Sequence, residues 1–152
     1  MNLSDNLSLA EAIKSATALR KGIANKPTQS HLINLKEVAN NIFQPCREHF
    51  GKPLRVTSGY RSAALNKAIG GSSKSQHSKG EALDMQSTKG YTNKELFMFI
   101  KDHLNFDQLI GEFPDNVGEF AWVHCSYKKE GNRGEVLIAY KDENNKTKYT
   151  KW

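Results

Sequence analysis

The chain contains the stretch Ser75-Gln76-His77-Ser78-Lys79-Gly80-Glu81-Ala82-Leu83-Asp84, in which a loop histidine is followed seven residues later by an aspartate. The alternating pattern of residues 81–85 predicts a short strand that contains the aspartate. Gly80 allows the loop to turn tightly before this strand. A second histidine follows in Trp122-Val123-His124, on a later predicted strand. The fold must therefore bring a loop and two strands together if these side chains act as a group.

His77, Asp84 and His124 form a predicted metal site. Imidazole nitrogens and carboxylate oxygens both bind zinc at about 2.0–2.2 Å. Three protein ligands leave a fourth position for water, which is the arrangement of a catalytic zinc ion rather than a structural one. Taken singly, each histidine has a simpler interpretation: His77 as a surface loop residue, and His124 as a sheet residue whose ring is satisfied by neighbours.

The order of predicted elements indicates an α+β domain in which N-terminal helices pack on a small antiparallel sheet. Helical periodicity extends over residues 9–20 and stops at Gly22. A second helix capped by Ser30 is expected to kink or end at Pro45 before one more turn over residues 46–50. Shorter elements follow: strands over 54–57 and 81–85, a helix over 63–69, a helix over 94–103 capped by Thr92, and strands over 106–110, 120–126, 136–140 and 146–150.

Composition limits the class of protein. A length of 152 residues suits a single domain spanning residues 1–152. We expect no membrane insertion, because no apolar run approaches the roughly 20 residues that cross a bilayer, and residues 1–5 do not begin a secretory signal. The net charge of +6 suits an anionic partner. The basic residues are dispersed rather than gathered in an arm, so we expect a solvated surface or contacts with cell-wall polymers and no nucleic acid.

The two cysteines, Cys46 and Cys125, are too few for a disulfide scaffold and have no metal-binding spacing. We expect free, buried thiols. A thiol protease formed by Cys125 and the neighbouring His124 is disfavoured, because adjacent residues on a strand point to opposite faces.

Three ordered motifs resemble those of the M15 peptidases: Ser58-Gly59-Tyr60-Arg61, the Ser75 to Asp84 stretch, and Trp122-Val123-His124. The similarity extends from about Glu11 to Tyr127 and includes Phe106-Asp107-Gln108-Leu109-Ile110, as in the single-domain subgroup common in phages and prophages. The family includes zinc D-Ala-D-Ala carboxypeptidases, dipeptidases and phage endolysins that cut the cell-wall stem peptide. The resemblance implies a hedgehog/D-Ala-D-Ala peptidase-like fold and a metallopeptidase with one zinc ion that hydrolyses D-amino-acid-containing bonds of peptidoglycan.

The resemblance also implies a role for individual residues. His77, Asp84 and His124 would bind zinc, and Arg61 would stabilise the oxyanion that forms on the scissile carbonyl. An ion pair that holds the turn is the alternative for Arg61. Four further residues are candidates for substrate binding: Ser75, Gln76, Tyr60 and Trp122. Ser75 could instead cap the loop, and Tyr60 could pack beneath the site. Trp122 could form a wall of the cleft.

The general base departs from the family pattern. Many relatives have an acidic residue three positions before the last ligand, where this chain has Ala121. A hairpin turn over residues 114–118 would place Glu112 opposite residues 120–122, so Glu112 is the predicted base. Glu119 is the second candidate, although an unbulged strand would direct it away from the face of His124. Both acids could instead be ordinary surface residues of a protein that binds metal without efficient hydrolysis.

A zinc-containing, non-catalytic module is therefore the alternative function, for instance a wall-binding or phage structural component. The segment from His124 to Tyr127 also resembles the hedgehog signalling domain, which keeps a zinc site without established peptidase use. For the catalytic interpretation we expect a monomer with a peptidoglycan peptide as its substrate. We expect a phage- or prophage-encoded protein, made in the cytoplasm and acting on the cell wall after release.

Overall fold

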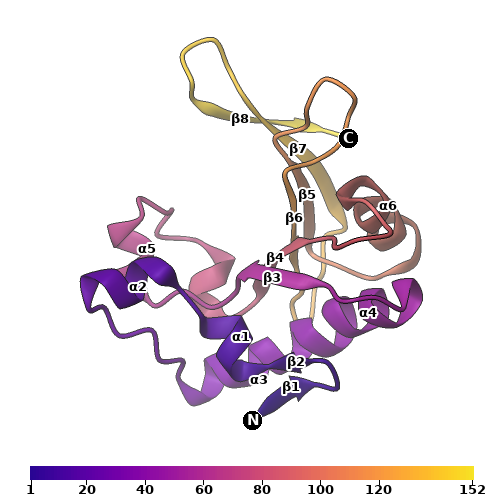
Figure 1. The fold of residues 1–152 in the computed structure, drawn as a ribbon. Coiled ribbons are helices and arrows are strands. Elements are labelled where there is room, and N and C mark those ends of the chain that lie inside the picture. The colour runs from indigo at the N-terminus through magenta and orange to yellow at the C-terminus, as the bar shows by residue number, and fades with distance from the viewer.

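The computed structural model describes residues 1–152 and combines short helices with a six-stranded sheet (Figure 1). The helices are α1 (Leu9–Ile13), α2 (Ala16–Lys21), α3 (Gln29–Val38), α4 (Gln44–Phe50), α5 (Ala63–Ala68) and α6 (Asn93–His103). A π-helical segment (Ala39–Phe43) joins α3 to α4, and a 3-10 helix (Gln76–Lys79) precedes β4. The strands are β1 (Asn2–Ser4), β2 (Leu7–Ser8), β3 (Arg55–Ser58), β4 (Ala82–Gln86), β5 (Gln108–Glu112), β6 (Trp122–Ser126), β7 (Glu135–Lys141) and β8 (Thr147–Lys151). The class is α+β, as predicted.

The sheet has the order β3-β4-β6-β5-β7-β8 and is mixed, so the prediction of an entirely antiparallel sheet is wrong. Strands β5 and β7 run parallel, whereas the other neighbouring pairs are antiparallel. The reason lies in the short connection between β6 and β7. Strand β7 reverses direction relative to β6, as after a hairpin, but β5 already lies between them. Strand β7 therefore pairs with β5 instead, in the same direction.

The N-terminal third differs from the prediction in three places. Residues 9–20 form two helices rather than one, because the backbone is extended at Lys14 and the Ser15 side chain caps α2. The next helix begins two residues earlier than expected, with Thr28 rather than Ser30 as its N-cap. Strands β1 and β2 form a small hairpin that was not predicted. Gly22 does end α2, in the left-handed conformation.

Pro45 lies near the start of α4, directly after the π-helical segment. Proline cannot donate the backbone hydrogen bond of a helix interior, and a π-helical segment is a known way to accommodate such a defect. The chain remains helical up to Phe50, so the predicted extra turn is confirmed.

The core occupies the face of the sheet opposite to the predicted ligands. Helix α6 begins at a capping box formed by Thr92 and Glu95, as its predicted Thr92 cap requires, and it contacts β5 and β6. Its Phe97 and Ile100 are fully buried together with Leu109 and Val123 of these strands. Because strand residues alternate between faces, the residues next to Leu109 and Val123 along each strand, such as Ile110 and His124, point away from α6. None of the helices combines the length and apolar character that crossing a membrane requires.

Candidate metal centre

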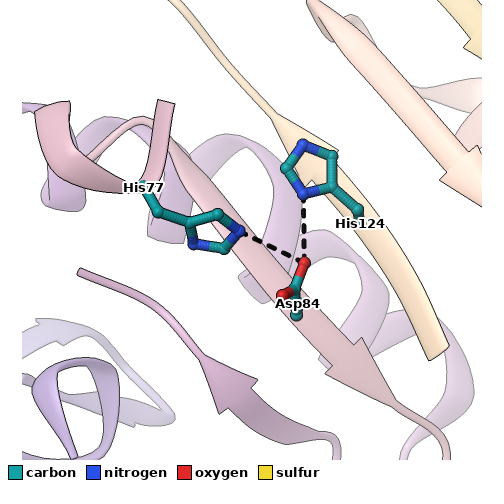
Figure 2. A group of neighbouring side chains, drawn as sticks. All are labelled: His77, Asp84 and His124. Carbon is teal, nitrogen blue, oxygen red and sulfur yellow. Dashed lines mark hydrogen bonds and ion pairs between the residues drawn. The ribbon is translucent and has the colours of Figure 1, made fainter. Parts of the chain in front are cut away.

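The three predicted ligands converge at one point of the sheet (Figure 2). Asp84 and His124 are directly paired across β4 and β6, and the 3-10 helix carries His77 beside them. One Asp84 carboxylate oxygen lies 3.0 Å from His124 Nδ1 and 3.3 Å from His77 Nε2. One ligand atom from each residue lies within 4.8 Å of the other two, which is close enough for a single ion to contact all three.

The ring of His77 is held in a fixed orientation. Its Nδ1 lies 2.7 Å from the carbonyl oxygen of Gly59, and a carbonyl can only accept, so Nδ1 carries the proton. In the neutral ring Nε2 then presents a lone pair toward Asp84. A hydrogen bond from the far side of the ring is typical of histidines that bind metals.

Gly59 packs closely against the backbone of Ala12 because it has no side chain. A Cβ atom at this position would lie 2.2 Å from the carbonyl oxygen of Ala12 in α1. The backbone N–H of Tyr60 also donates to that oxygen, over 2.8 Å. The segment Ser58-Gly59-Tyr60-Arg61 therefore fixes β3 against α1 and presents its carbonyl to His77 at the same time.

The loop that carries His77 is closed by its own residues. The Ser75 hydroxyl accepts a hydrogen bond from the backbone N–H of His77, so Ser75 caps the 3-10 helix. Gly80 ends the helix with φ of +77°, in a region that favours glycine. The tight turn predicted at Gly80 is confirmed.

The donor set fits a divalent metal ion. His77 is 2% exposed, His124 is buried as well, and the Asp84 side chain is 14% exposed, so three donors face one another with little water between them. Burial by itself would raise the pKa of Asp84, but the two imidazoles hold it below its ordinary value. A carboxylate that stays ionised beside an imidazole lone pair requires a cation, which can be a proton or a metal.

Glu112 lies on the same face of the sheet as His124. Strands β5 and β6 pair Ile110 with His124 and Glu112 with Trp122, so the predicted pairing of Glu112 with the segment 120–122 is confirmed. Burial raises the pKa of Glu112 to about 7, the charge of Asp84 adds to this effect, and His124 and Arg61 oppose it. A half-buried carboxylate with such a pKa can accept and release a proton near neutral pH.

Arg61 extends to the same place. Its backbone N–H donates to the carbonyl of His77, and its Nε is buried without a hydrogen-bond partner. Burial lowers its pKa, whereas the charges of Asp84 and Glu112 raise it, and all three residues line the same cavity. It forms no ion pair within 4.0 Å, so the alternative of an ion pair that holds the turn is not observed.

These side chains open on one cavity of about 680 Å³. The family model described as Peptidase M15 matches residues 5–126, which include all of the motifs and the three ligands. The chain belongs to the peptidase M15 family. Its metallopeptidases typically use zinc, which agrees with the His-Asp-His donor set of this M15 chain. No match to a curated protein was found.

Three predicted substrate-binding residues line the cavity of this M15 chain: Ser75, Gln76 and Trp122. Ser75 is also the predicted loop cap, and Gln76 Nε2 donates to the buried carboxylate of Asp107 over 3.0 Å. Trp122 packs edge to face against Phe113 as a wall of the cavity. Its buried indole N–H forms no hydrogen bond of ordinary geometry, but it interacts with the Glu112 carboxylate and lowers the pKa of that group.

Two predicted residues lie elsewhere. The Glu119 carboxylate accepts hydrogen bonds from the backbone N–H groups of Asn93 and Lys94, so it stabilises the N-terminus of α6 instead of facing His124. Tyr60 is 4% exposed and packs against His31 in the core, as the alternative of packing beneath the site proposes. Cys46 and Cys125 are free and buried, as predicted.

Several cavity residues were not identified from the sequence of this M15 chain. Phe113 follows β5 with a positive φ of 52°, and Arg133 forms a two-pronged ion pair with Asp107. Thr147 and Tyr149 come from β8. The Phe-Asp-Gln-Leu-Ile segment marks Asp107 as part of the family pattern, but no local signal marks the other four residues.

Proposed function

We propose that the chain is a zinc-dependent peptidase that hydrolyses D-amino-acid-containing peptide bonds of bacterial peptidoglycan, in stem peptides or in cross-links. One observation carries the proposal: the three ligands, an acid with a raised pKa and an unpaired arginine all open on one cavity. A binding module has no need of the last two groups. The D-amino-acid specificity rests on the resemblance of the motifs to M15 enzymes of the cell wall.

The roles of the chain's residues follow from their positions. A zinc ion held by His77, Asp84 and His124 would polarise the scissile carbonyl and make a water molecule more acidic. The Glu112 carboxylate accepts the proton of the attacking water and returns it to the nitrogen of the departing amine. Arg61 stabilises the negative charge that develops on the carbonyl oxygen, because it lines the cavity beside the ligands and has no ion-pair partner.

The charge of the cavity supports a substrate with carboxylates. Arg61, Lys74 and Arg133 line it, against the two acids Asp84 and Glu112. Asp84 belongs to the ligand set, Glu112 is the base and Arg133 is already paired with Asp107, so Arg61 and Lys74 are the cations that remain to meet substrate carboxylates. Peptidoglycan stem peptides and anionic wall polymers both suit such a surface.

Purified peptidoglycan provides the direct test. The protein is expected to release new amino groups from it, and mass spectrometry of the soluble fragments identifies the bond that is cut. A chelator should abolish release and added zinc should restore it. His77→Ala should remove both the stoichiometric zinc and the activity. Stoichiometric zinc without any release of amines would refute the proposal and favour the non-catalytic module.

A further inference from the structure

One wall of the cavity is formed by a part of the chain beyond the residues that the family model matches. The match ends at residue 126, whereas β7 and β8 span Glu135–Lys141 and Thr147–Lys151. These two strands form a hairpin at one end of the sheet that rises away from the helices (Figure 1). Thr147 and Tyr149 of β8 line the same cavity as the metal ligands.

The sheet register places Tyr149 in line with the predicted base. Four residues lie side by side across β6, β5, β7 and β8: Trp122 pairs with Glu112, Glu112 with Ala139, and Ala139 with Tyr149. Neighbouring strands are about 4.8 Å apart, so only the width of Ala139 separates Tyr149 from Glu112. Ala139 is fully buried between these larger neighbours, and its small side chain leaves room for them on this face of β7.

The phenol group is free to bind a ligand. Tyr149 is 56% exposed, so its ring is not part of the core. Tyr149 lines the same cavity as Glu112 and Asp84. Its pKa is raised, first by burial and then by the charges of these two acids, so the hydroxyl stays protonated and can donate. The nearest side-chain hydrogen bond on this hairpin joins Lys141 to Thr147 and does not involve Tyr149.

The loop that leads to the 3-10 helix also lines the cavity, through Gly71, Ser72 and Lys74. A peptide between this loop and β8 would pass over the ligands and under the ring of Tyr149. Its carbonyl groups would then lie within reach of the phenol.

We propose that Tyr149 is a substrate-binding residue, whose ring covers the peptide beside Glu112 and whose hydroxyl donates a hydrogen bond to a peptide carbonyl. The inference rests on the proposed peptidase function and extends its site to the hairpin of β7 and β8. A peptidase that consists of the matched residues alone would lack this contact.

Tyr140 provides a matched control. It lies on the same hairpin, is 41% exposed and pairs with Lys148, so strand alternation directs it to the face opposite to Tyr149. The test compares the effect of Tyr149→Phe and Tyr149→Ala with that of Tyr140→Phe and Tyr140→Ala. The substrate is the shortest soluble stem peptide that the wild-type protein cleaves.

Tyr149→Phe is expected to lower kcat/KM about threefold to tenfold, mainly through KM, since one neutral hydrogen bond is lost. Tyr149→Ala should lower it at least about tenfold, because the ring contact is lost as well. The Tyr140 variants should stay within about twofold of the wild type. Peptide binding to zinc-loaded protein that also carries Glu112→Gln, measured by calorimetry, should weaken in the same order with little turnover.

Two results would overturn the inference. One is an active wild type whose Tyr149 variants match the Tyr140 variants in both KM and binding. The other is a loss of activity in Tyr149→Ala that coincides with lost zinc or a Tm below that of Tyr140→Ala, since the role would then be structural. A wild-type protein that cleaves no peptide refutes the peptidase proposal instead, so the two failures are distinguishable.

Discussion

Replacing Glu112 with glutamine tests the assignment of the base, because the amide keeps the shape of the side chain but cannot take up a proton. Glu112 is not among the ligands, so zinc should remain at one ion per chain. General acid–base catalysis contributes about 100-fold to 10,000-fold in rate. We therefore expect kcat to fall by that factor, which corresponds to about 2.7–5.4 kcal/mol in the activation barrier.

The pH profile provides a second measure of the same residue. The active form is the carboxylate, so kcat/KM should fall about tenfold per pH unit below the pKa of Glu112. Burial raises that pKa from 4.5 to about 7, and a cation at the three ligands would lower it again. The acid limb should therefore have its midpoint between these two values, and it should be absent from the residual activity of Glu112→Gln.

Glu119→Gln is the matched control, because it removes an acid of the same type from a nearby position outside the cavity. The Glu119 carboxylate accepts backbone hydrogen bonds of 3.0 and 2.8 Å at the start of α6. Its loss should destabilise the fold by about 1 kcal/mol, or about 2–4 °C in Tm, and leave kcat unchanged. The reasoning fails if Glu112→Gln retains kcat within tenfold of the wild type, or if Glu119→Gln is the variant that loses turnover.

Three further predictions concern the metal and its surroundings. Removing zinc with a chelator should lower Tm by about 5–10 °C relative to protein with zinc at 100 times its Kd, and an unchanged Tm in calorimetry would contradict a folded-state metal site. Gly59→Ala should weaken zinc binding about 10-fold to 100-fold in a competitive chelator titration. The new Cβ would meet the Ala12 carbonyl oxygen at 2.2 Å and displace the Gly59 carbonyl, which accepts the hydrogen bond of His77. A variant with wild-type zinc affinity would show that this hydrogen bond is dispensable. Asp107→Asn should lower the free energy of unfolding by about 2 kcal/mol near neutral pH, since its charge-assisted bonds to Arg133 are lost. Arg133 and Gln76 hold the pKa of Asp107 at about 2 against the effect of burial. This stabilisation is therefore present above pH 4 and lost as the pH falls toward 2. A stability difference between Asp107→Asn and the wild type that does not shrink in acid would refute this prediction.

The local elements and the ligands could be predicted from the sequence, because their signals are local. Thr92 caps α6, and Gly22 and Gly51 end α2 and α4 in the left-handed conformation. The ligands lie in motifs with fixed spacing. The boundaries were less accurate: the strand predicted over 106–110 spans Gln108–Glu112.

The parallel pairing of β5 with β7 could not be predicted in this way. Alternation along a strand indicates which face a residue occupies, but it does not identify the neighbouring strand. The turn over 114–118 joins adjacent strands, so the pairing of Glu112 with Trp122 could be inferred from it. No comparable signal links β7 to β5 or places Tyr149 beside the cavity, because that position depends on two further pairings.

The absence of an acid at position 121 shows why pairing matters for the chemistry. A general base has to occupy a point in space near the metal, and its position in the sequence is secondary. The backbone N–H of Ala121, the residue directly before β6, donates to the carbonyl of Glu112 over 2.8 Å, so the two residues are neighbours at the end of β5. Cross-strand neighbours lie about 5 Å apart, which a glutamate side chain can span. An alanine at 121 and a glutamate at 112 can therefore serve the same site as an acid at 121, provided that the hairpin keeps this register.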